Sequence, residues 1–196
     1  MVATQQALSA NGPLADWPGF VERGAQLRLA AAIAQAMDDR AVLIAEAGTG
    51  TGKTFAYLVP ALLSGLRVIV STGTRALQDQ LFQRDLPRLR HALGARLRVA
   101  LLKGRANYLC LYRLEQARLD RIAGSVHAVE LSSLAVHAQA CADGDIGAVQ
   151  HIAEDSVIWP LVTSTIDNCL GSDCPRYAEC FVVKARAEAQ AADLVV

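Results

Sequence analysis

A glycine-rich segment in the first third of the chain has the composition of a phosphate-binding loop. Its alternate glycines permit a tight turn and leave backbone N–H groups open to an anion. A helix predicted to begin near Lys53 would add the partial positive charge of its N-terminus. The Lys53 side chain can reach the β- and γ-phosphates of a nucleoside triphosphate, and the Thr54 hydroxyl can coordinate Mg²⁺. We predict that phosphate binding uses Ala47, Gly48, Thr49, Gly50, Thr51, Gly52, Lys53 and Thr54.

The loop departs from the usual pattern at its first position, where Ala47 replaces glycine. Its expected context supports the interpretation, because a short apolar run at 41–45 precedes it and a helical pattern follows it. The motif by itself is compatible with both ATP and GTP.

Five cysteines are the second group of residues with chemical potential. Cys169, Cys174 and Cys180 fall in a turn-rich segment with a proline directly after the second, and Cys110 lies far upstream. This pattern favours a thiolate site over core packing. Zinc and a [4Fe–4S] cluster are both compatible with such spacing, and plain buried cysteines are the remaining alternative. Cys141, on an alanine-rich stretch, is predicted to be a small buried residue.

The elements that must position these residues follow from the hydrophobic pattern. Helices are predicted at 25–37, 53–64, 75–83 and 88–93, and buried strands at 41–45, 67–71 and 97–102. This alternation predicts a parallel sheet with right-handed crossovers. Later residues predict helices at 108–120, 128–140, 146–154 and 181–192, an irregular cysteine-bearing loop at 167–180, and a strand starting at Asp193.

The predicted organisation is a P-loop core interrupted by a small helical insert. An irregular lead-in covers 1–24, the core covers 25–107, the insert covers 108–185, and 186–196 returns to the core. The fold class is therefore α/β, a parallel sheet flanked by helices. No apolar run is long enough for a membrane span, and the N-terminus has no signal peptide, so we expect a cytoplasmic protein.

The net charge is zero, with 19 basic and 19 acidic residues, but the charges are unevenly distributed. The charged residues of 84–121 are mostly basic, and those of 122–180 are mostly acidic. A basic stretch of this kind indicates either a polyanion-binding region or solvated helix faces, and charge alone leaves both open. The basic residues are Arg84, Arg88, Arg90, Arg96, Arg98, Lys103, Arg105, Arg113, Arg118 and Arg121.

Several motifs together resemble one family. The run from Glu46 to Thr54, followed by Ala-Tyr-Leu-Val-Pro at 56–60, resembles the first helicase motif of the DinG/XPD group, the iron–sulfur DNA helicases of superfamily 2. Within that group the sequence is most similar to the bacterial YoaA-like branch. Residues 71–81 resemble the next motif, which contacts the DNA backbone, and residues 102–110 resemble the segment with the first cluster ligand. Arg23 and Gln26 resemble the upstream Q-motif, whose glutamine reads adenine in that family.

The resemblance implies specific roles. It implies ATP and Mg²⁺ as ligands of a RecA-like core, with a [4Fe–4S] cluster on Cys110, Cys169, Cys174 and Cys180 of a helical insert. It implies DNA, single-stranded or forked, as the partner, with 5′ to 3′ travel and a role in repair or replication alongside other proteins. The residues expected near DNA are Thr72, Thr74, Arg75, Lys103 and Arg105.

The family's Asp-Glu-Ala-His motif, which holds Mg²⁺ and activates water, does not occur in the 196 residues. We therefore expect an incomplete first helicase domain, an N-terminal fragment of an ATP-dependent DNA helicase, which binds ATP without hydrolysing it usefully. The alternative from another class is a P-loop nucleotide-binding module with a structural zinc site.

Overall fold

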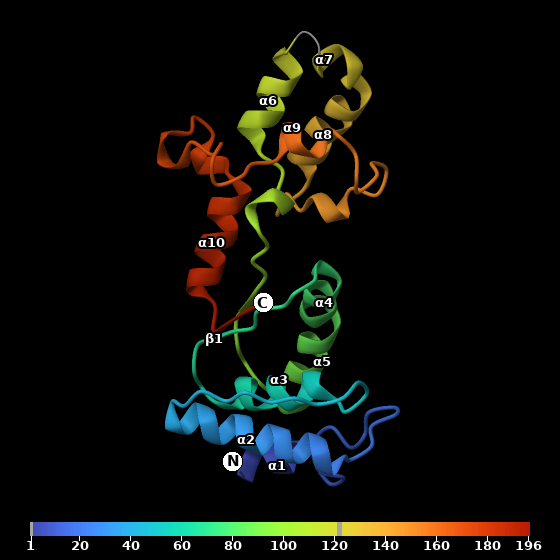
Figure 1. Cartoon of the computed structure of the whole chain (residues 1–196), viewed down its shortest axis with the longest axis vertical. Coiled ribbons are helices and arrows are strands. Elements are labelled where there is room, and N and C mark those ends of the chain that lie inside the picture. The colour runs from blue at the N-terminus through green and yellow to red at the C-terminus, as the bar shows by residue number, and fades with distance from the viewer. Residues whose placement is uncertain (1, 121–122) are drawn as a thin grey trace. The chain divides into compact units, whose positions relative to one another are not determined.

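The computed structural model describes residues 2–120 and 123–196, and the chain divides into two compact units (Figure 1). The first unit comprises Met1–Ala100 and Ala192–Val196, and the second comprises Leu101–Ala191. The last residues of the chain thus rejoin the first unit.

Three helices form one side of the first unit: α1 (Val2–Ala7), α2 (Gly24–Asp39) and α3 (Lys53–Leu63). The helices α2 and α3 lie side by side (Figure 1), and buried residues of both, including Ala30 and Leu58, form part of the core. The prediction of an irregular lead-in over 1–24 is wrong at its start, where α1 forms. The reason is burial, because the segment directly after α1 inserts Leu8 and Leu14 completely into the core.

A long helical stretch follows the first strand. It consists of α4 (Arg75–Gln80), a π-helical turn (Leu81–Asp85) and α5 (Leu86–Leu93). The sequence predicted an interruption near Pro87, but the helical path continues through it. The wide π turn ends just before α5, so Pro87 falls in a first helical turn, where its missing N–H has no role in the helix. Leu81, Leu86 and Leu89 are buried and hold this stretch to the core.

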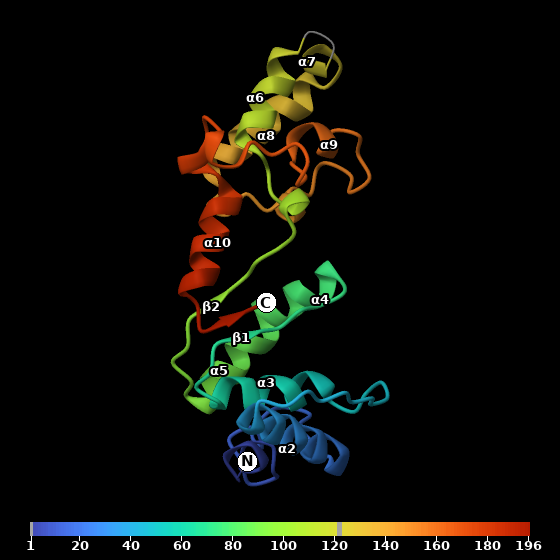
Figure 2. The same ribbon diagram turned by 60° about the vertical axis from the view of Figure 1, so that its left-hand side comes forward.

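The sheet is small, with three parallel strands in the order β1 (Val68–Ile69), β3 (Leu194–Val195) and β2 (Val99–Ala100). Leu194 pairs with both Val68 and Val99 (Figure 2 labels β1 and β2). The parallel arrangement predicted from the sequence is therefore confirmed, as is the strand at the end of the chain. The predicted strands at 67–71 and 97–102 are shorter than expected, and Ile69 is 80% exposed rather than buried.

The predicted buried strand at 41–45 is wrong. Within the described residues this segment joins no sheet, and Val42 and Ile44 are 93% and 94% exposed. An apolar run becomes a buried strand only when neighbouring strands and covering helices enclose it. Here β1, β3 and β2 pair with one another and not with 41–45, which leads as extended chain into the glycine-rich loop.

The second unit is helical, with α6 (Leu111–Leu119), α7 (Ala123–Val126), α8 (Ala128–Ala140), α9 (Trp159–Val162) and α10 (Phe181–Ala191). Figure 2 shows α6 beside α8, and their buried faces meet in one core that includes Leu114, Leu131 and Leu134. Short 3-10 turns occur at Arg105–Asn107, Ile146–Ala148, Gly171–Asp173 and Tyr177–Glu179. Helices predicted at 108–120, 128–140 and 181–192 are thus confirmed with small shifts.

The helix predicted at 146–154 is wrong, because only the 3-10 turn Ile146–Ala148 forms there. The Asp145 carboxylate accepts a hydrogen bond from the Gly147 N–H at 2.9 Å, a local contact that competes with helix formation. The cysteine-bearing segment at 167–180 is irregular, as predicted, apart from its two short turns. Across the described part of the chain, the helices are too short or too polar for a transmembrane segment.

Candidate functional site

The glycine-rich loop runs directly into α3, and two of its positions have backbone conformations that favour glycine. Gly50 and Gly52 have φ values of 76° and 81°, in the left-handed region that side chains rarely adopt. Gly52 is also the N-cap of α3, and a Cβ there would overlap the side chain of Gln26. The tight turn that aims a helix N-terminus at an anion is therefore present at the predicted position.

Lys53 folds back over the loop. Its ammonium group donates to the carbonyl oxygens of Ala47 and Gly48, each at 2.7 Å. The Thr51 hydroxyl also donates to the Gly48 carbonyl, at 2.9 Å. These contacts place the lysine charge at the mouth of the loop, where it remains solvent-exposed and accessible to a phosphate.

Both upstream residues predicted to bind nucleotide contact the same loop. The Arg23 guanidinium donates to the Gly50 carbonyl at 2.5 Å, and the Gln26 side-chain amide donates to the Gly52 carbonyl at 2.9 Å. Each of them therefore binds one of the two glycines with positive φ. Arg23 is the N-cap residue of α2 and Gln26 is buried in its first turn, so α2 fixes both side chains against the loop.

A cavity of about 300 Å³ opens beside these contacts. Its wall includes loop and α3 residues, the two upstream residues, and the π-helical turn. The Trp17 and Phe55 rings contact each other nearby, with centroids 5.2 Å apart. The cavity is lined by Gly19, Phe20, Val21, Arg23, Gln26, Gly52, Thr54, Phe55, Gln80, Arg84 and Asp85.

A buried carboxylate in this wall was not anticipated from the sequence. Asp85 is 6% exposed, and its two oxygens accept hydrogen bonds from Gln80 and Arg84, both at 2.9 Å. Burial raises the pKa of the nearby Tyr57 above its usual value; a hydrogen bond with the Thr54 side chain opposes this rise, and the Asp85 charge adds to it. Thr54, the predicted Mg²⁺ ligand, is thus held by a tyrosine at the edge of the cavity.

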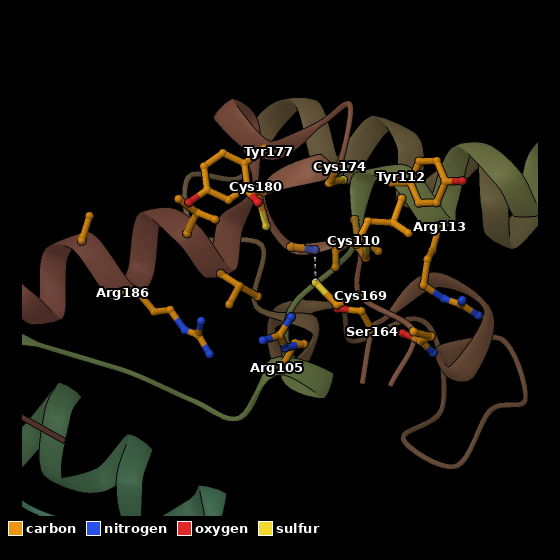
Figure 3. Close-up of a pocket in the computed structure, with 18 of the residues that line it drawn as sticks. Arg105, Cys110, Tyr112, Arg113, Ser164, Cys169, Cys174, Tyr177, Cys180 and Arg186 are labelled. Atoms are coloured by element: carbon orange, nitrogen blue, oxygen red, sulfur yellow. Dashed lines mark hydrogen bonds between the residues drawn. The ribbon is translucent and has the colours of Figure 1, made fainter. Parts of the chain in front are cut away.

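The second candidate site is a cavity of about 460 Å³ within the second unit, and all four predicted ligand cysteines line it (Figure 3). Cys110 comes from the segment before α6, and Cys169, Cys174 and Cys180 come from the irregular segment before α10. Three arginines, Arg105, Arg113 and Arg186, line the same cavity. The structure therefore places four cysteines that are up to 70 residues apart in the sequence in the wall of one cavity.

Backbone contacts fix the four cysteines. The Cys110 N–H donates to the Val162 carbonyl at 2.7 Å, and the Cys110 carbonyl accepts from Leu114 in the first turn of α6. The Cys180 carbonyl likewise accepts from Lys184 in the first turn of α10. In the loop, the Cys169 sulfur accepts from the Gly171 N–H at 3.5 Å, and the Cys174 N–H donates to the Gly171 carbonyl.

The thiols of this cavity are free. Partial burial raises the pKa of Cys110; the Arg113 N–H opposes the rise, and charge on Cys180 and Cys174 adds to it. Among the residues that the structure describes, no three His, Cys, Asp or Glu side chains are gathered closely enough to ligate a single ion.

Cys141 lies apart from the other four. It follows α8 and packs, partly buried, against the core of the second unit. Burial raises its pKa as well. This placement agrees with its predicted role as a small packing residue.

The residues expected near DNA have different surroundings. Thr74 is the N-cap of α4, where its hydroxyl accepts from the Leu77 N–H at 3.3 Å, and the Thr72 hydroxyl donates to the Thr74 carbonyl at 3.2 Å. Arg75 is exposed on the first turn of α4. Arg105 lines the cysteine cavity.

Lys103 does not have the exposure that a DNA contact requires. Its side chain is only 3% exposed, and its ammonium group forms an ion pair with Asp145 at 2.6 Å. The reason is that the Lys103 side chain turns inward to Asp145, although its neighbour Gly104 is exposed. Lys103 is therefore removed from the set of DNA-contacting candidates.

Residues that the sequence reasoning missed are Asp85 and Gln80 in the cavity beside the glycine-rich loop, and Asp145 beside Lys103. The only sequence signal for Asp85 is its position next to Arg84 in an otherwise amphipathic helix. Nothing in the local sequence indicates that Asp145 lies beside a lysine 42 positions away.

The model of the DEAD/DEAH box helicase family matches residues 29–128, slightly more than half of the chain. The chain belongs to the DEAD/DEAH box helicase family. It is 55% identical to the ATP-dependent DNA helicase YoaA of Escherichia coli over 183 residues, and 50% identical to YoaA of Haemophilus influenzae over 190 residues. It is 38% identical to the ATP-dependent helicase DinG of Mycobacterium tuberculosis. These similarities confirm the resemblance to the DinG and YoaA helicases.

The alignments cover most of this chain but a smaller part of each relative. They include 91% of the chain and 28% of YoaA from Escherichia coli, 96% and 30% for Haemophilus influenzae, and 91% and 30% for DinG. The DEAD/DEAH box chain therefore spans less than one third of the length of these relatives.

Proposed function

We propose that this chain forms the ATP-binding part of an ATP-dependent DNA helicase. The observation that carries the proposal is the loop 47–54 at the start of α3, with Lys53 at its mouth and a cavity beside it. A triphosphate in the loop would receive backbone N–H groups, the helix N-terminus and the Lys53 charge. The names of the relatives, ATP-dependent DNA helicases, support the same activity for the whole protein.

The adjacent cavity supports adenine as the base. Gln26 and Arg23 have donors at its wall, and Phe20 and Phe55 supply aromatic surface. Adenine needs such a combination, because its ring stacks on apolar surface while its edge exchanges hydrogen bonds with an amide side chain. The ligand pair is therefore ATP with Mg²⁺, and Thr54 provides the hydroxyl for the metal.

The 196-residue chain binds ATP without hydrolysing it at a useful rate. The carboxylates that activate water in this family belong to an Asp-Glu-Ala-His motif, which the sequence does not contain. Unwinding, with 5′ to 3′ travel on a single strand or fork, belongs to a protein of the relatives' length acting in bacterial DNA repair or replication, in the cytoplasm.

We further propose that Cys110, Cys169, Cys174 and Cys180 hold a [4Fe–4S] cluster. Two observations support the fit: all four line one cavity of about 460 Å³, and the donor set consists of sulfur alone. Arg105 and Arg186 at the cavity offset the negative charge that four thiolates bring. A bound cluster would link four chain positions covalently. In the first unit, the residues proposed to contact the DNA backbone are Thr72, Thr74 and Arg75.

A zinc-bearing binding module is the alternative, because the same thiolates suit zinc chemically. Anaerobic purification of the chain followed by metal analysis separates the two. A brown protein with iron and sulfide in equal amounts supports the cluster, whereas a colourless protein with one zinc per chain overturns it.

The nucleotide assignment is tested by titration calorimetry with ATP and GTP in the presence of Mg²⁺. We expect saturable ATP binding and much weaker GTP binding. Equal affinity for the two nucleotides would remove the base-reading role of Gln26, and absence of any binding would overturn the proposal.

A further inference from the structure

An ion pair with a buried lysine lies at the start of the segment that leads to Cys110. The Lys103 ammonium and the Asp145 carboxylate are 2.6 Å apart, with side chains 3% and 17% exposed. Lysine is almost never buried to this extent unless an opposite charge accompanies it. The pair joins segments 42 residues apart, one leading to Cys110 and the other following α8.

Hydrogen bonds connect this ion pair to the backbone that leads to Cys110. The Lys103 N–H donates to the Tyr108 hydroxyl at 2.9 Å, and Tyr108 forms an isolated antiparallel bridge with Asp145. The Leu109 N–H then donates to the Gly144 carbonyl at 2.8 Å, and the Cys110 N–H donates to Val162 at 2.7 Å. The segment 103–110 is therefore attached to the rest of the second unit at its start, Lys103, and at its end, Tyr108 to Cys110.

Asp145 is held from its other side as well. Its second carboxylate oxygen accepts from the Gly147 N–H at 2.9 Å, so the carboxylate both caps a 3-10 turn and faces the lysine. A side chain fixed at two points has few alternative rotamers. The ammonium group of Lys103, and with it the backbone that leads to Cys110, therefore has one well-defined position.

We propose that Lys103 and Asp145 are positioning residues for Cys110, and that their ion pair determines how tightly the four-cysteine cavity retains an iron–sulfur cluster. This inference rests on the proposed cluster. Removing the charge of Asp145 leaves a buried ammonium group without its carboxylate partner, and the lysine side chain then moves towards water. The segment 103–110 follows, and the Cys110 sulfur moves away from its place in the cavity wall.

A second ion pair in the same unit provides a matched comparison. Arg176, between Cys174 and Cys180, binds Glu115 on α6 at 2.9 Å, but these side chains are 34% and 46% exposed. Exposed pairs contribute little, because water screens them and the free partners are readily hydrated. Glu115→Gln is therefore the control for Asp145→Asn. Both substitutions remove one carboxylate charge from the second unit, but the partner of Asp145 is a buried lysine, whereas Arg176 is partly exposed and also pairs with Glu179.

The test uses the 196-residue chain reconstituted anaerobically with iron and sulfide. We expect Asp145→Asn to lose its cluster to an iron chelator roughly 10- to 100-fold faster than the unaltered chain, the usual effect of removing a residue that supports a ligand. Glu115→Gln should accelerate loss by no more than about fivefold. Tyr108→Phe, which removes only the hydroxyl that holds Lys103, should act in the direction of Asp145→Asn but more weakly.

A second measurement does not depend on the cluster. In the metal-free chain, maleimide labelling of Cys110, followed by mass spectrometry normalised to cysteine-free peptides of the same digest, should be faster in Asp145→Asn and unchanged in Glu115→Gln. Far-ultraviolet circular dichroism verifies the folding of each variant. If Asp145→Asn does not fold, the same labelling measurement is made on Tyr108→Phe.

The outcomes are distinguishable. If the folded Asp145→Asn or Tyr108→Phe variant keeps the chelation and labelling rates of the unaltered chain, the positioning role is overturned. If the unaltered chain takes up zinc instead of a cluster while Cys110 labelling still responds to Asp145→Asn, the cluster assignment fails and the positioning role stands.

Discussion

The side-chain amide of Gln26 donates a hydrogen bond to the carbonyl oxygen of Gly52, with nitrogen and oxygen 2.9 Å apart. This single contact joins the buried first turn of α2 to the N-cap of α3, where the phosphates of a nucleotide would lie. The Gln26 side chain and the glycine-rich turn are therefore mechanically linked.

Replacing Gly52 by alanine should abolish ATP binding. The new Cβ would overlap the Gln26 side chain, and the backbone at φ 81° disfavours any side chain. The unfolding free energy should also fall by about 1–2 kcal/mol from backbone strain. Calorimetry with ATP and urea denaturation measure the two effects.

Gly94→Ala is the control for that substitution. Gly94 also has positive φ, 61°, but a Cβ there meets open space at the end of α5. We expect a similar loss of stability with normal ATP binding. Equal loss of ATP binding in both variants would show that strain alone, rather than the contact with Gln26, explains the first result.

Lys53→Met should weaken ATP binding by roughly 10- to 100-fold, the value of one charge-assisted hydrogen bond. Stability should change little, because the Lys53 side chain is exposed and bonds only to loop carbonyls. The affinity for adenosine, which lacks phosphates, should be unchanged, and this comparison provides the internal control. An ATP affinity equal to that of the unaltered chain would remove Lys53 from the site.

Gln26→Ala should reduce the preference for ATP over GTP by about tenfold, because one hydrogen bond to the base is lost. Gln35→Ala is the matched control, since Gln35 lies on the same helix and bonds only to Asp39 at the surface. Competition binding with both nucleotides gives the ratio. A ratio unaffected by Gln26→Ala would limit its role to holding the loop.

Asp85→Ala should lower the unfolding free energy by about 1–3 kcal/mol, because the buried carboxylate accepts from both Gln80 and Arg84. Asp38→Ala, an exposed acidic residue at the end of α2, should change stability by less than about 0.5 kcal/mol. Urea midpoints measure both. Equal midpoints for the two variants would contradict a structural role for Asp85.

Alkaline pH should destabilise the first unit through Tyr57. Burial raises the pKa of this phenol above its ordinary value of 10.0. The folded state then favours the protonated phenol. The resulting contribution to the free energy of unfolding is complete below pH about 10 and is lost as the pH rises through the folded-state pKa. Tyr57→Phe should flatten the alkaline decline of the urea midpoint, and tyrosinate absorbance should show one fewer late-titrating phenol.

The sequence predicted which residues lie together better than it predicted the shape of the sheet: the loop 47–54 contacts Arg23 and Gln26, and four of the cysteines line one cavity. The glycine-rich loop and Lys53 are contiguous in the sequence, and Arg23 and Gln26 both lie at the start of α2. Sequence spacing is therefore enough to identify these residues. The predicted strand at 41–45 is wrong because an apolar run specifies burial only together with its neighbours, and periodicity over five residues contains no information about them.

The remaining differences have the same origin. Pro87 predicted a break in the helix, but it lies in the first turn of α5, directly after the π-helical turn, where proline is tolerated. Lys103 looked like a phosphate contact because it lies in a basic stretch, whereas its partner Asp145 lies in the acidic half of the chain. Pairings over such distances arise from tertiary packing, and no local pattern announces them.

The exposed segment at 41–45 has a practical consequence for solution work. Val42 and Ile44 present apolar surface on extended backbone, a form that associates readily with other extended chains. Self-association should therefore increase with protein concentration, and light scattering should reveal it before any loss of secondary structure. We expect colloidal solubility, rather than folding, to set the highest concentration at which nucleotide titrations of this chain succeed.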